Sequence, residues 1–395
     1  MRKLAFIFDT VMLHDENDNY YELNLNYNLW KDRYLPVFDE IIVSARVKDM
    51  KHSEIVKKRG YTISNGDSVR IVPVTDYNIV TDVFTKRKKI LRQLENIINQ
   101  ADCVIIRMPS PLSDLACDLC RKKNKKYAIE MVACAWDGYM HHGHWAGPIV
   151  APYMYFRTKR QCHKATRVLY VTSKFLQNRY PTSGKTINAS NVIINDTNVD
   201  VLEKRIEKIK NSDNNSYILG MVGTLELESK GHIIALKALK LLKEDYPNIK
   251  FEILGKGEGK KLRQKIEKLG LNKNVILKGT LPSGDPVLQW MDNIDILVIP
   301  SFQEGLPRVL IEAMSRACPA VGSNAGGIPE LIDSRVIHKK GNYRKLYQDL
   351  KLIIENRDIT IELAKQNFQN AKQYTKSKLD KKRKMFWINF RDNEK

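Results

Sequence analysis

The chain alternates between short apolar stretches and longer stretches with helical spacing of apolar residues. In the first half, the apolar stretches are rich in β-branched residues and have the length of buried strands. They cover residues 4–8, 40–45, 69–74, 103–108, 127–132, 167–172 and 191–194. Helix-like segments lie between most of them. This alternation predicts an α/β fold with a parallel sheet covered on both faces.

The second half repeats the pattern after a charged, polar connection at 202–215. Its expected strands cover residues 217–222, 250–254, 275–278, 294–299 and 320–322, and helices follow most of them. Two copies of the pattern in 395 residues predict two Rossmann-like domains. We place the first domain at 1–198, the second at 199–370 and a basic C-terminal helix at 371–395.

One expected helix, at 83–100, is amphipathic and basic. Val83, Ile90 and Leu94 fall on its apolar face, whereas Lys88 and Lys89 lie largely elsewhere. Such a helix can rest on a membrane surface. We favour the alternative, in which the apolar face packs on the sheet.

Composition narrows the class of protein. The chain has 66 Lys and Arg against 45 Asp and Glu, a net charge of +21, which suits nucleic acid, anionic lipid or phosphorylated substrates. Because no nucleic-acid-binding signature accompanies the charge, we expect no nucleic-acid partner. The first nine residues read as a strand, and no apolar run could span a membrane, so we expect a cytoplasmic protein. Cys117 and Cys120 form one isolated CxxC, which helix packing explains better than zinc.

The clearest candidate chemistry follows the apolar strand at 294–299. Glu304 stands in the next loop, and Glu312 lies in the helix that Pro307 opens. Backbone N–H groups at Gly305 and Leu306 suit an anion such as phosphate, and carboxylates accept hydrogen bonds from hydroxyls. Phosphate with several hydroxyls describes a sugar nucleotide. The alternative is that Glu312 is a surface residue paired with arginines at i−4 and i+4.

These residues also carry a family resemblance. Glu304-Gly305 and Glu312-Ala313-Met314, with Pro300-Ser301 before and Gly326-Gly327 after, match the donor-site motif of retaining glycosyltransferases of family 4. The resemblance implies the GT-B fold, in which two Rossmann-like domains face each other across a cleft and the last helix returns to the first domain. It implies the following donor-binding residues: Gly223, Thr224, Lys230, Gly255, Lys278, Gly279, Glu304, Gly305, Leu306, Pro307 and Glu312.

Lys230 stands at the start of an expected helix, where a cation is mildly unfavourable unless an anion is bound. A solvated lysine is the simpler reading. The pair Lys230-Gly231 resembles the family pattern. However, relatives usually carry an arginine soon after the glycine at 223, and this chain has Thr224 and Leu225 there.

An unusual run at 130–148 follows an expected strand and mixes aromatic, acidic and histidine residues. Aromatic rings and neutral polar groups suit sugars, although a packed loop is the alternative. Three nearby histidines do not complete a convincing metal site. The stretch resembles bacterial exopolysaccharide and capsule glycosyltransferases, so we expect acceptor binding by Glu130, Trp136, Asp137, Tyr139 and His142.

The resemblance implies transfer of a sugar from a nucleotide sugar with retention at the anomeric carbon. Catalytic roles fall to Glu304 and Lys230, with Asp137 or His142 orienting the acceptor. No Asp-x-Asp occurs, so we expect no metal and no other cofactor. We expect a lipid-linked saccharide acceptor and peripheral attachment to the inner face of the cell membrane. A sugar-nucleotide epimerase and an inactive partner subunit are the alternatives.

Overall fold

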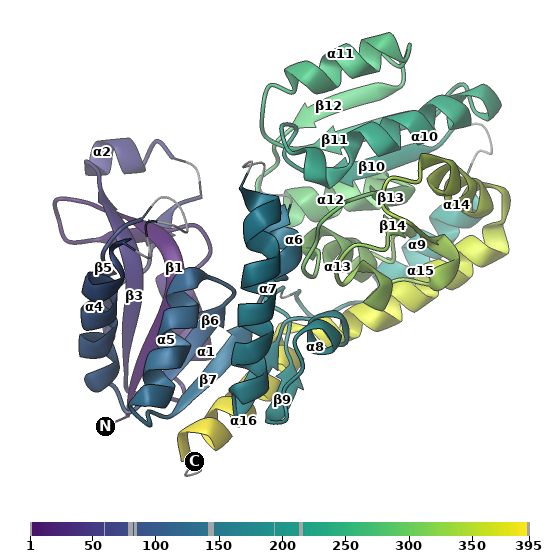
Figure 1. Ribbon diagram of the computed structural model, residues 1–395. Helices are drawn as coiled ribbons and strands as arrows, with labels where there is room; N and C mark the ends of the chain where they lie inside the picture. The colour runs from purple at the N-terminus through teal and green to yellow at the C-terminus, as the bar shows by residue number, and fades with distance from the viewer. Residues whose placement is uncertain are drawn as a thin grey trace. The chain divides into compact units, whose positions relative to one another are not determined.

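The computed structural model describes residues 2–58, 60–77, 82, 85–140, 146–192, 194–212 and 216–392 (Figure 1). The chain divides into two compact units: unit 1 comprises residues 1–189 and 380–395, and unit 2 comprises residues 190–379. Unit 2 begins before residue 199 because Ile194 forms a β-bridge with Thr375 of the same unit. The last helix, α16 (Lys376–Asp392), starts in unit 2, and from Asp380 onward it belongs to unit 1.

Unit 1 is built on a sheet that has nine strands among the described residues. The strands are β1 (Lys3–His14), β2 (Tyr20–Glu22), β3 (Glu40–Asp49), β4 (Thr62–Ile63), β5 (Val69–Val74), β6 (Cys103–Met108), β7 (Tyr127–Met131), β8 (Arg167–Tyr170) and β9 (Lys185–Asn188). The parallel part runs in the order β5-β3-β1-β6-β7-β8-β9, and β2 and β4 extend it antiparallel beyond the end of β1. The chain winds outward from β1 and then returns to β6, which places the topological switch point between these two strands.

Helices cover both faces of this sheet (Figure 1). They are α1 (Tyr27–Arg33), α2 (His52–Ile55), α4 (Arg87–Asn99), α5 (Pro111–Lys122), α6 (Ala135–Met140), α7 (Gly147–Lys164), α8 (Phe175–Arg179) and the end of α16. Ala5 and Ile7 share a core with α4, α5 and α7, whereas the alternate residue Phe6 stacks edge-on against Trp30 of α1. The expected helix at 83–100 is α4, whose apolar side is buried; Val83 lies outside the described residues.

One expectation for unit 1 was wrong. The last strand of this sheet is not the one expected after residue 190 but β9, four residues of mixed polarity at the sheet edge, where one strand neighbour is missing and burial is incomplete. The run at 130–148 begins in β7, passes through a short connection at 132–134 and enters α6 at Ala135, and its last residues open α7. Residues 141–145 lie outside the described residues.

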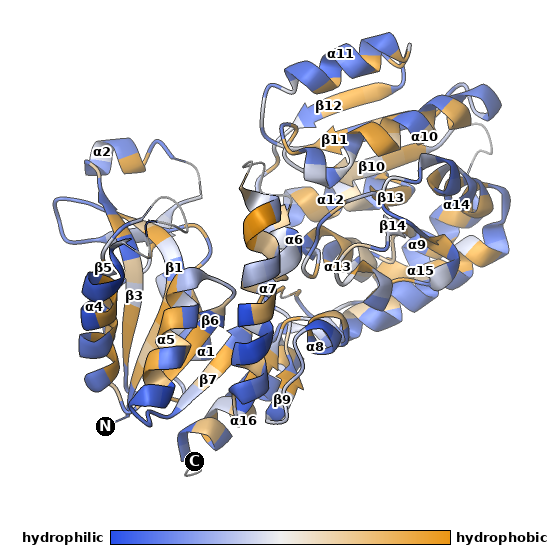
Figure 2. Cartoon of the chain, in the orientation of Figure 1, coloured by the Kyte–Doolittle hydropathy of each residue, from blue (hydrophilic) through white to orange (hydrophobic). Residues whose placement is uncertain are grey.

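Unit 2 contains, among the described residues, a parallel six-stranded sheet. Its strands are β10 (Ile218–Val222), β11 (Lys250–Leu254), β12 (Val275–Gly279), β13 (Ile296–Ile299), β14 (Ala320–Ser323) and β15 (Ile337–His338), in the order β12-β11-β10-β13-β14-β15. The switch point lies between β10 and β13. Figure 2 shows these strands as predominantly hydrophobic, and their side chains form one large core.

The sheet of unit 2 is packed against helices. They are α9 (Val199–Lys210), α10 (His232–Asp245), α11 (Lys260–Lys268), α12 (Asp285–Asn293), α13 (Arg308–Ser315), α14 (Tyr343–Glu355) and α15 (Arg357–Ala371). α10 contacts α11 and α14, whereas α13 contacts α12 and α15, and α15 contacts α9. Across the part of the chain that the structure describes, no helix combines the length and the apolar character needed to span a bilayer.

Candidate functional site

Two loops meet at the switch point of unit 2. One follows β10 and leads to α10, and the other follows β13 and leads to α13. The amide of Phe302 donates to the carbonyl of Ser229 over 2.7 Å. Gly231 has φ +78°, and a Cβ there would lie 2.2 Å from the Pro300 carbonyl oxygen. Glycine therefore allows the two loops to lie in contact.

This contact brings Lys230 and Glu304 together. The Lys230 ammonium lies 2.7 Å from Glu304 Oε1, and the Ser301 hydroxyl donates to the same oxygen over 2.8 Å. The two charged side chains are 30% and 11% exposed. Among the described residues, Oε2 of Glu304 accepts no hydrogen bond. The arrangement can hold a ligand hydroxyl at that oxygen and an anionic group beside the ammonium.

Glycines align two further loops, those after β11 and β12, with the loop after β10 at the same edge. The Gly223 amide donates to Leu254, and the Gly255 amide donates to Gly279, each over 2.8 Å. A Cβ on Gly255 would lie 1.9 Å from the Gly223 carbonyl oxygen. Glu226, which the sequence analysis missed, accepts from the Gly259 amide over 2.8 Å and so holds the start of α11 beside this site. The Gly259 amide that its side chain binds lies 33 residues further along the chain, and no local sequence pattern predicted this contact.

The loop after β14 holds the backbone of the Glu304 loop in place. Gly326 has φ +53°, and a Cβ there would lie 1.9 Å from the Glu304 carbonyl oxygen. The Gly327 amide donates to Gly305 over 2.7 Å. Pro307 is buried and caps α13, as expected from its place in the sequence. The glycine pair after the motif therefore has a direct physical role in positioning Glu304.

Glu312 is half-buried on α13 and lines a cavity of about 230 Å³ within unit 2. Residues 194–198 form much of the opposite wall, with Gly284 and Leu288. Burial raises the pKa of Glu312, and the charge of Arg308 only partly counteracts this effect. Arg316 forms its ion pair with Asp292 instead, at 2.6 Å, so the expected alternative of a surface glutamate held between two arginines does not describe this helix.

Other predicted donor residues take different places. The Lys278 ammonium lies 3.2 Å from Glu252 on the neighbouring strand. Thr224 is half-buried and Leu225 is buried in the core. A packed apolar side chain therefore lies where relatives usually carry an arginine. His232, which the sequence analysis missed, is 4% exposed at the start of α10, and burial lowers its pKa.

Glu130, a predicted acceptor-binding residue, lies in the interior of unit 1. Its side chain is 1% exposed inside unit 1 and accepts a hydrogen bond from the Tyr34 hydroxyl. Glu130 stands opposite Arg107 in the register of β6 and β7, and its charge partly counteracts the lowering of the Arg383 pKa that burial causes. A carboxylate enclosed in this way stabilises a buried arginine on α16.

Three of the other acceptor candidates, Trp136, Asp137 and Tyr139, follow β7 at the carboxyl edge of the unit 1 sheet. Trp136 is half-buried and packs edge-on against Tyr155, Asp137 is buried on α6, and His142 lies outside the described residues. Tyr139 is half-buried; burial, together with the charge of Asp9, raises its pKa.

An unpredicted polar cluster lies beside Tyr139. The Arg46 Nε lies 2.9 Å from an Asp9 carboxylate oxygen, and the Tyr77 hydroxyl donates to the other. Asp9 follows the part of β1 that pairs with β6, so the cluster stands at the switch point of this sheet. Its members are 31 or more residues apart, and the sequence carried no signal that joined them.

Comparisons with known proteins agree with this arrangement. The family model "Glycosyl transferases group 1" matches residues 202–374. Protein CapJ of Staphylococcus aureus is 30% identical over 392 residues, covering 98% of this chain and 96% of CapJ. The putative colanic acid biosynthesis glycosyltransferase WcaL of Escherichia coli is 35% identical over 114 residues, 27% of this chain and 28% of WcaL.

Among solved structures, Anabaena Alr3699/HepE in complex with UDP superimposes with a TM-score of 0.64 at 16% identity, covering 97% of this chain and 98% of HepE. This similarity confirms the expected fold, which consists of two Rossmann-like α/β units. The family match, the near full-length similarity to CapJ and the shared fold together show that the chain belongs to the group 1 glycosyl transferases.

Proposed function

We propose that the protein transfers a sugar from a nucleotide sugar to a saccharide acceptor, with retention at the anomeric carbon. The observation that carries the proposal is the Lys230–Glu304 pair at the switch point of unit 2, with one Glu304 oxygen open to a ligand. HepE, which shares the fold, has been solved with UDP and with UDP-glucose. A donor of this class supplies the hydroxyls and the diphosphate that the two side chains recognise.

In this mechanism Glu304 accepts hydrogen bonds from donor-sugar hydroxyls. Lys230 and the N-terminal amides of α10 and α13 stabilise the negative charge that develops on the departing diphosphate. Glu312 holds the ribose diol. The acceptor hydroxyl attacks on the face of the leaving group, and its proton passes to the departing phosphate. No glycosidase-type carboxylate pair and no metal ion take part.

Unit 1 supplies the acceptor groups. Trp136 and Tyr139 offer aromatic surface, and Asp137 and His142 orient the reacting hydroxyl. The polar cluster of Asp9, Arg46 and Tyr77 adds a preorganised carboxylate at the same sheet edge. The relatives include a putative colanic acid biosynthesis glycosyltransferase, which supports a place for the reaction in polysaccharide synthesis.

We further propose that the acceptor is lipid-linked and that the protein binds the inner face of the cell membrane. Ile149, Tyr153 and Phe156 on α7 are 70%, 47% and 66% exposed, and they share one helix face. Figure 2 shows hydrophobic first turns and hydrophilic last turns in this helix, where Lys159 and Arg160 are exposed. Apolar residues followed by basic ones suit the surface of an anionic bilayer.

Nucleotide-sugar turnover tests the site. Nucleotides and nucleotide sugars are first screened for those that raise the melting temperature, because a ligand of the native state stabilises it. With the selected donor, Glu304→Gln and Lys230→Gln should each lower kcat/KM by about 100-fold or more, as the loss of a charged transition-state contact does. Glu258→Gln, an exposed acid after β11, serves as the control.

Three readouts separate the alternatives. Sugar transferred to an acceptor supports the proposal, whereas an isomerised nucleotide sugar indicates an epimerase. Activity that survives chelation with EDTA agrees with metal-free transfer. Full activity in both Glu304→Gln and Lys230→Gln would overturn the assignment of the site.

Vesicle flotation tests the membrane contact. Binding to vesicles that contain phosphatidylglycerol should fall in Ile149→Ser/Phe156→Ser and at high salt, because both apolar insertion and charge attraction contribute. Ile276→Ser, at an exposed apolar residue of unit 2, is the matched control. Unchanged flotation in the α7 variant would remove this helix from the proposal.

A further inference from the structure

A second cavity, of about 490 Å³, lies in unit 1. Its walls come from the ends of α5 and α7, the beginnings of β7, β8 and β9, and the end of α16. The lining residues are Cys120, Arg121, Asn124, Lys125, Lys126, Tyr127, Lys164, Thr166, Arg167, Lys185 and Phe390. Because parallel strands begin here, the cavity lies at the amino edge of the sheet, opposite the carboxyl edge where Asp9 and Tyr139 stand.

The charged residues that line this cavity all carry positive charge. Among the described residues that line it, six are lysine or arginine and none is acidic. Arg167 is 8% exposed, and it stands directly opposite Lys185 in the register of β8 and β9. Like charges that face each other across neighbouring strands repel. A bound anion would offset this repulsion.

The protein itself neutralises little of this charge. Arg121 forms an ion pair with Asp118. Across the described parts of the chain, Lys125, Lys164, Arg167 and Lys185 form no ion pair with a carboxylate. Burial, with repulsion from Arg167 and Arg2 that the charge of Asp392 partly offsets, lowers the pKa of Lys126. Four cations without acidic partners around one cavity indicate a ligand that brings negative charge.

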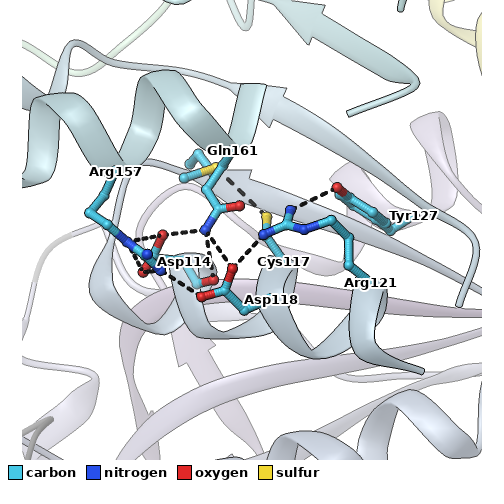
Figure 3. Close-up of polar contacts among 8 residues, drawn as sticks. Asp114, Cys117, Asp118, Arg121, Tyr127, Arg157 and Gln161 are labelled. Carbon is cyan, nitrogen blue, oxygen red and sulfur yellow. Dashed lines mark hydrogen bonds and ion pairs between the residues drawn. The ribbon is translucent and has the colours of Figure 1, made fainter. Parts of the chain in front are cut away.

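The framework around the cavity is rigid. Figure 3 shows Asp114 and Asp118 of α5 held by Arg157 and Gln161 of α7; Arg157 donates in parallel from Nε to Asp114 Oδ1 over 3.1 Å and from Nη2 to Asp114 Oδ2 over 2.6 Å. Arg121 also donates to the Tyr127 hydroxyl over 3.0 Å. These contacts join the two helices whose ends border the cavity and hold the Arg121 guanidinium in place before any ligand arrives.

Helix ends alone do not explain the cluster. Cations are favoured near helix C-termini, and Arg121 and Lys164 occupy such positions. The last carbonyls of α5, however, accept hydrogen bonds from the backbone amides of residues 123–125. Arg167 and Lys185 lie on strands and not in the last turn of a helix. The helix dipole therefore does not explain why these two cations line the cavity.

We propose that this cavity binds a phosphorylated ligand that carries at least two negative charges, at a site separate from the sugar-transfer site. A buried guanidinium recognises phosphate oxygens in pairs, and the surrounding ammonium groups add charge without fixed geometry. The cavity volume falls in the range of small-molecule sites and exceeds what a single phosphate fills. Phe390, Tyr127 and Cys120 supply an apolar wall for the rest of the ligand.

Isothermal titration with inorganic pyrophosphate tests the proposal. Because the sugar-transfer site also binds diphosphate, every variant is made in a Lys230→Gln background. Lys164→Gln/Lys185→Gln, which changes two exposed side chains, should weaken pyrophosphate binding by about tenfold or more, as two charge-assisted contacts are lost. Lys88→Gln/Lys89→Gln on α4 removes the same charge elsewhere in unit 1 and should change the affinity by less than about twofold.

A second arm identifies the source of the phosphate. Vesicles of phosphatidylcholine with phosphatidic acid, whose phosphate monoester can carry two negative charges, are floated with the same two variants, with and without pyrophosphate. Vesicle binding that is lost in the cavity variant and competed by pyrophosphate assigns the site to a lipid head group. Pyrophosphate binding that is lost without any change in flotation assigns it to a soluble phosphorylated compound. Equal behaviour of the cavity and control variants in both arms overturns the proposal.

Discussion

Replacing Gly231 by alanine tests whether the contact between the two switch-point loops creates the Lys230–Glu304 site. Gly231 has φ +78°, where a residue with a Cβ is strained by about 1 kcal/mol. The new Cβ would also meet the Pro300 carbonyl oxygen at 2.2 Å, whereas ordinary contacts begin at 3.4 Å. The loops must therefore move apart by about 1.2 Å, and such overpacking adds roughly 1–3 kcal/mol.

The same displacement should impair chemistry. Lys230 precedes Gly231 directly, so the shift separates its ammonium from Glu304, now 2.7 Å away. A misplacement of about 1 Å at a reacting centre costs about 100-fold in rate. We expect kcat/KM with the selected nucleotide sugar to fall by about that factor, together with a lower melting temperature.

Gly270→Ala provides the matched control. Gly270 has φ +68°, but a Cβ there would meet no heavy atom of the described residues within 4 Å, so this position carries the backbone strain without the collision. Thermal unfolding and steady-state turnover are measured on both variants. If Gly231→Ala and Gly270→Ala lose equal stability and both keep normal turnover, then the close approach to Pro300 does not hold the site together, and the reasoning fails.

Three further predictions follow from burial. Glu312→Gln should raise the melting temperature at pH 7 while weakening donor binding. Burial raises the pKa of Glu312, so ionisation of this carboxylate destabilises the folded protein increasingly as the pH rises above about 4.5. Below that pH the melting temperatures of the variant and the unchanged protein should converge. Arg205→Met should lower stability by about 3 kcal/mol or more in chemical denaturation, since its guanidinium donates to the carbonyls of Met291 and Ile294 at 2.6 and 2.7 Å and those groups would lose their partner. Trp387→Ala should cost about 3–5 kcal/mol of unfolding free energy, whereas Trp387→Phe should cost far less, because the fully buried indole N–H has no hydrogen-bond partner among the described residues and packing alone holds the ring.

Local pattern was enough to predict the fold class and most strands. Apolar β-branched runs are buried in any parallel sheet, so strands such as β6 and β13 could be placed from composition alone. The donor motif was equally local, since Glu304 and Glu312 stand on one loop and the helix that follows it. Sequence pattern did not predict edge strand β9, because its residues are not uniformly apolar. It also did not predict α6 and α7, because a run of mixed polar and aromatic residues resembles a loop.

The sequence by itself therefore determined the two α/β repeats and the placement of Glu304 and Glu312 on one loop and the helix that follows it, because both depend on residues close together in the chain. The tertiary structure alone decided which groups meet. Lys230 reaches Glu304 across 74 residues because β10 and β13 are neighbours in the sheet. Glu130 is enclosed because α1 packs over the sheet and brings Tyr34 to it. The basic cavity gathers residues from 120 to 390 because the strands of unit 1 begin at one common edge, and no spacing along the chain encodes that distance in space.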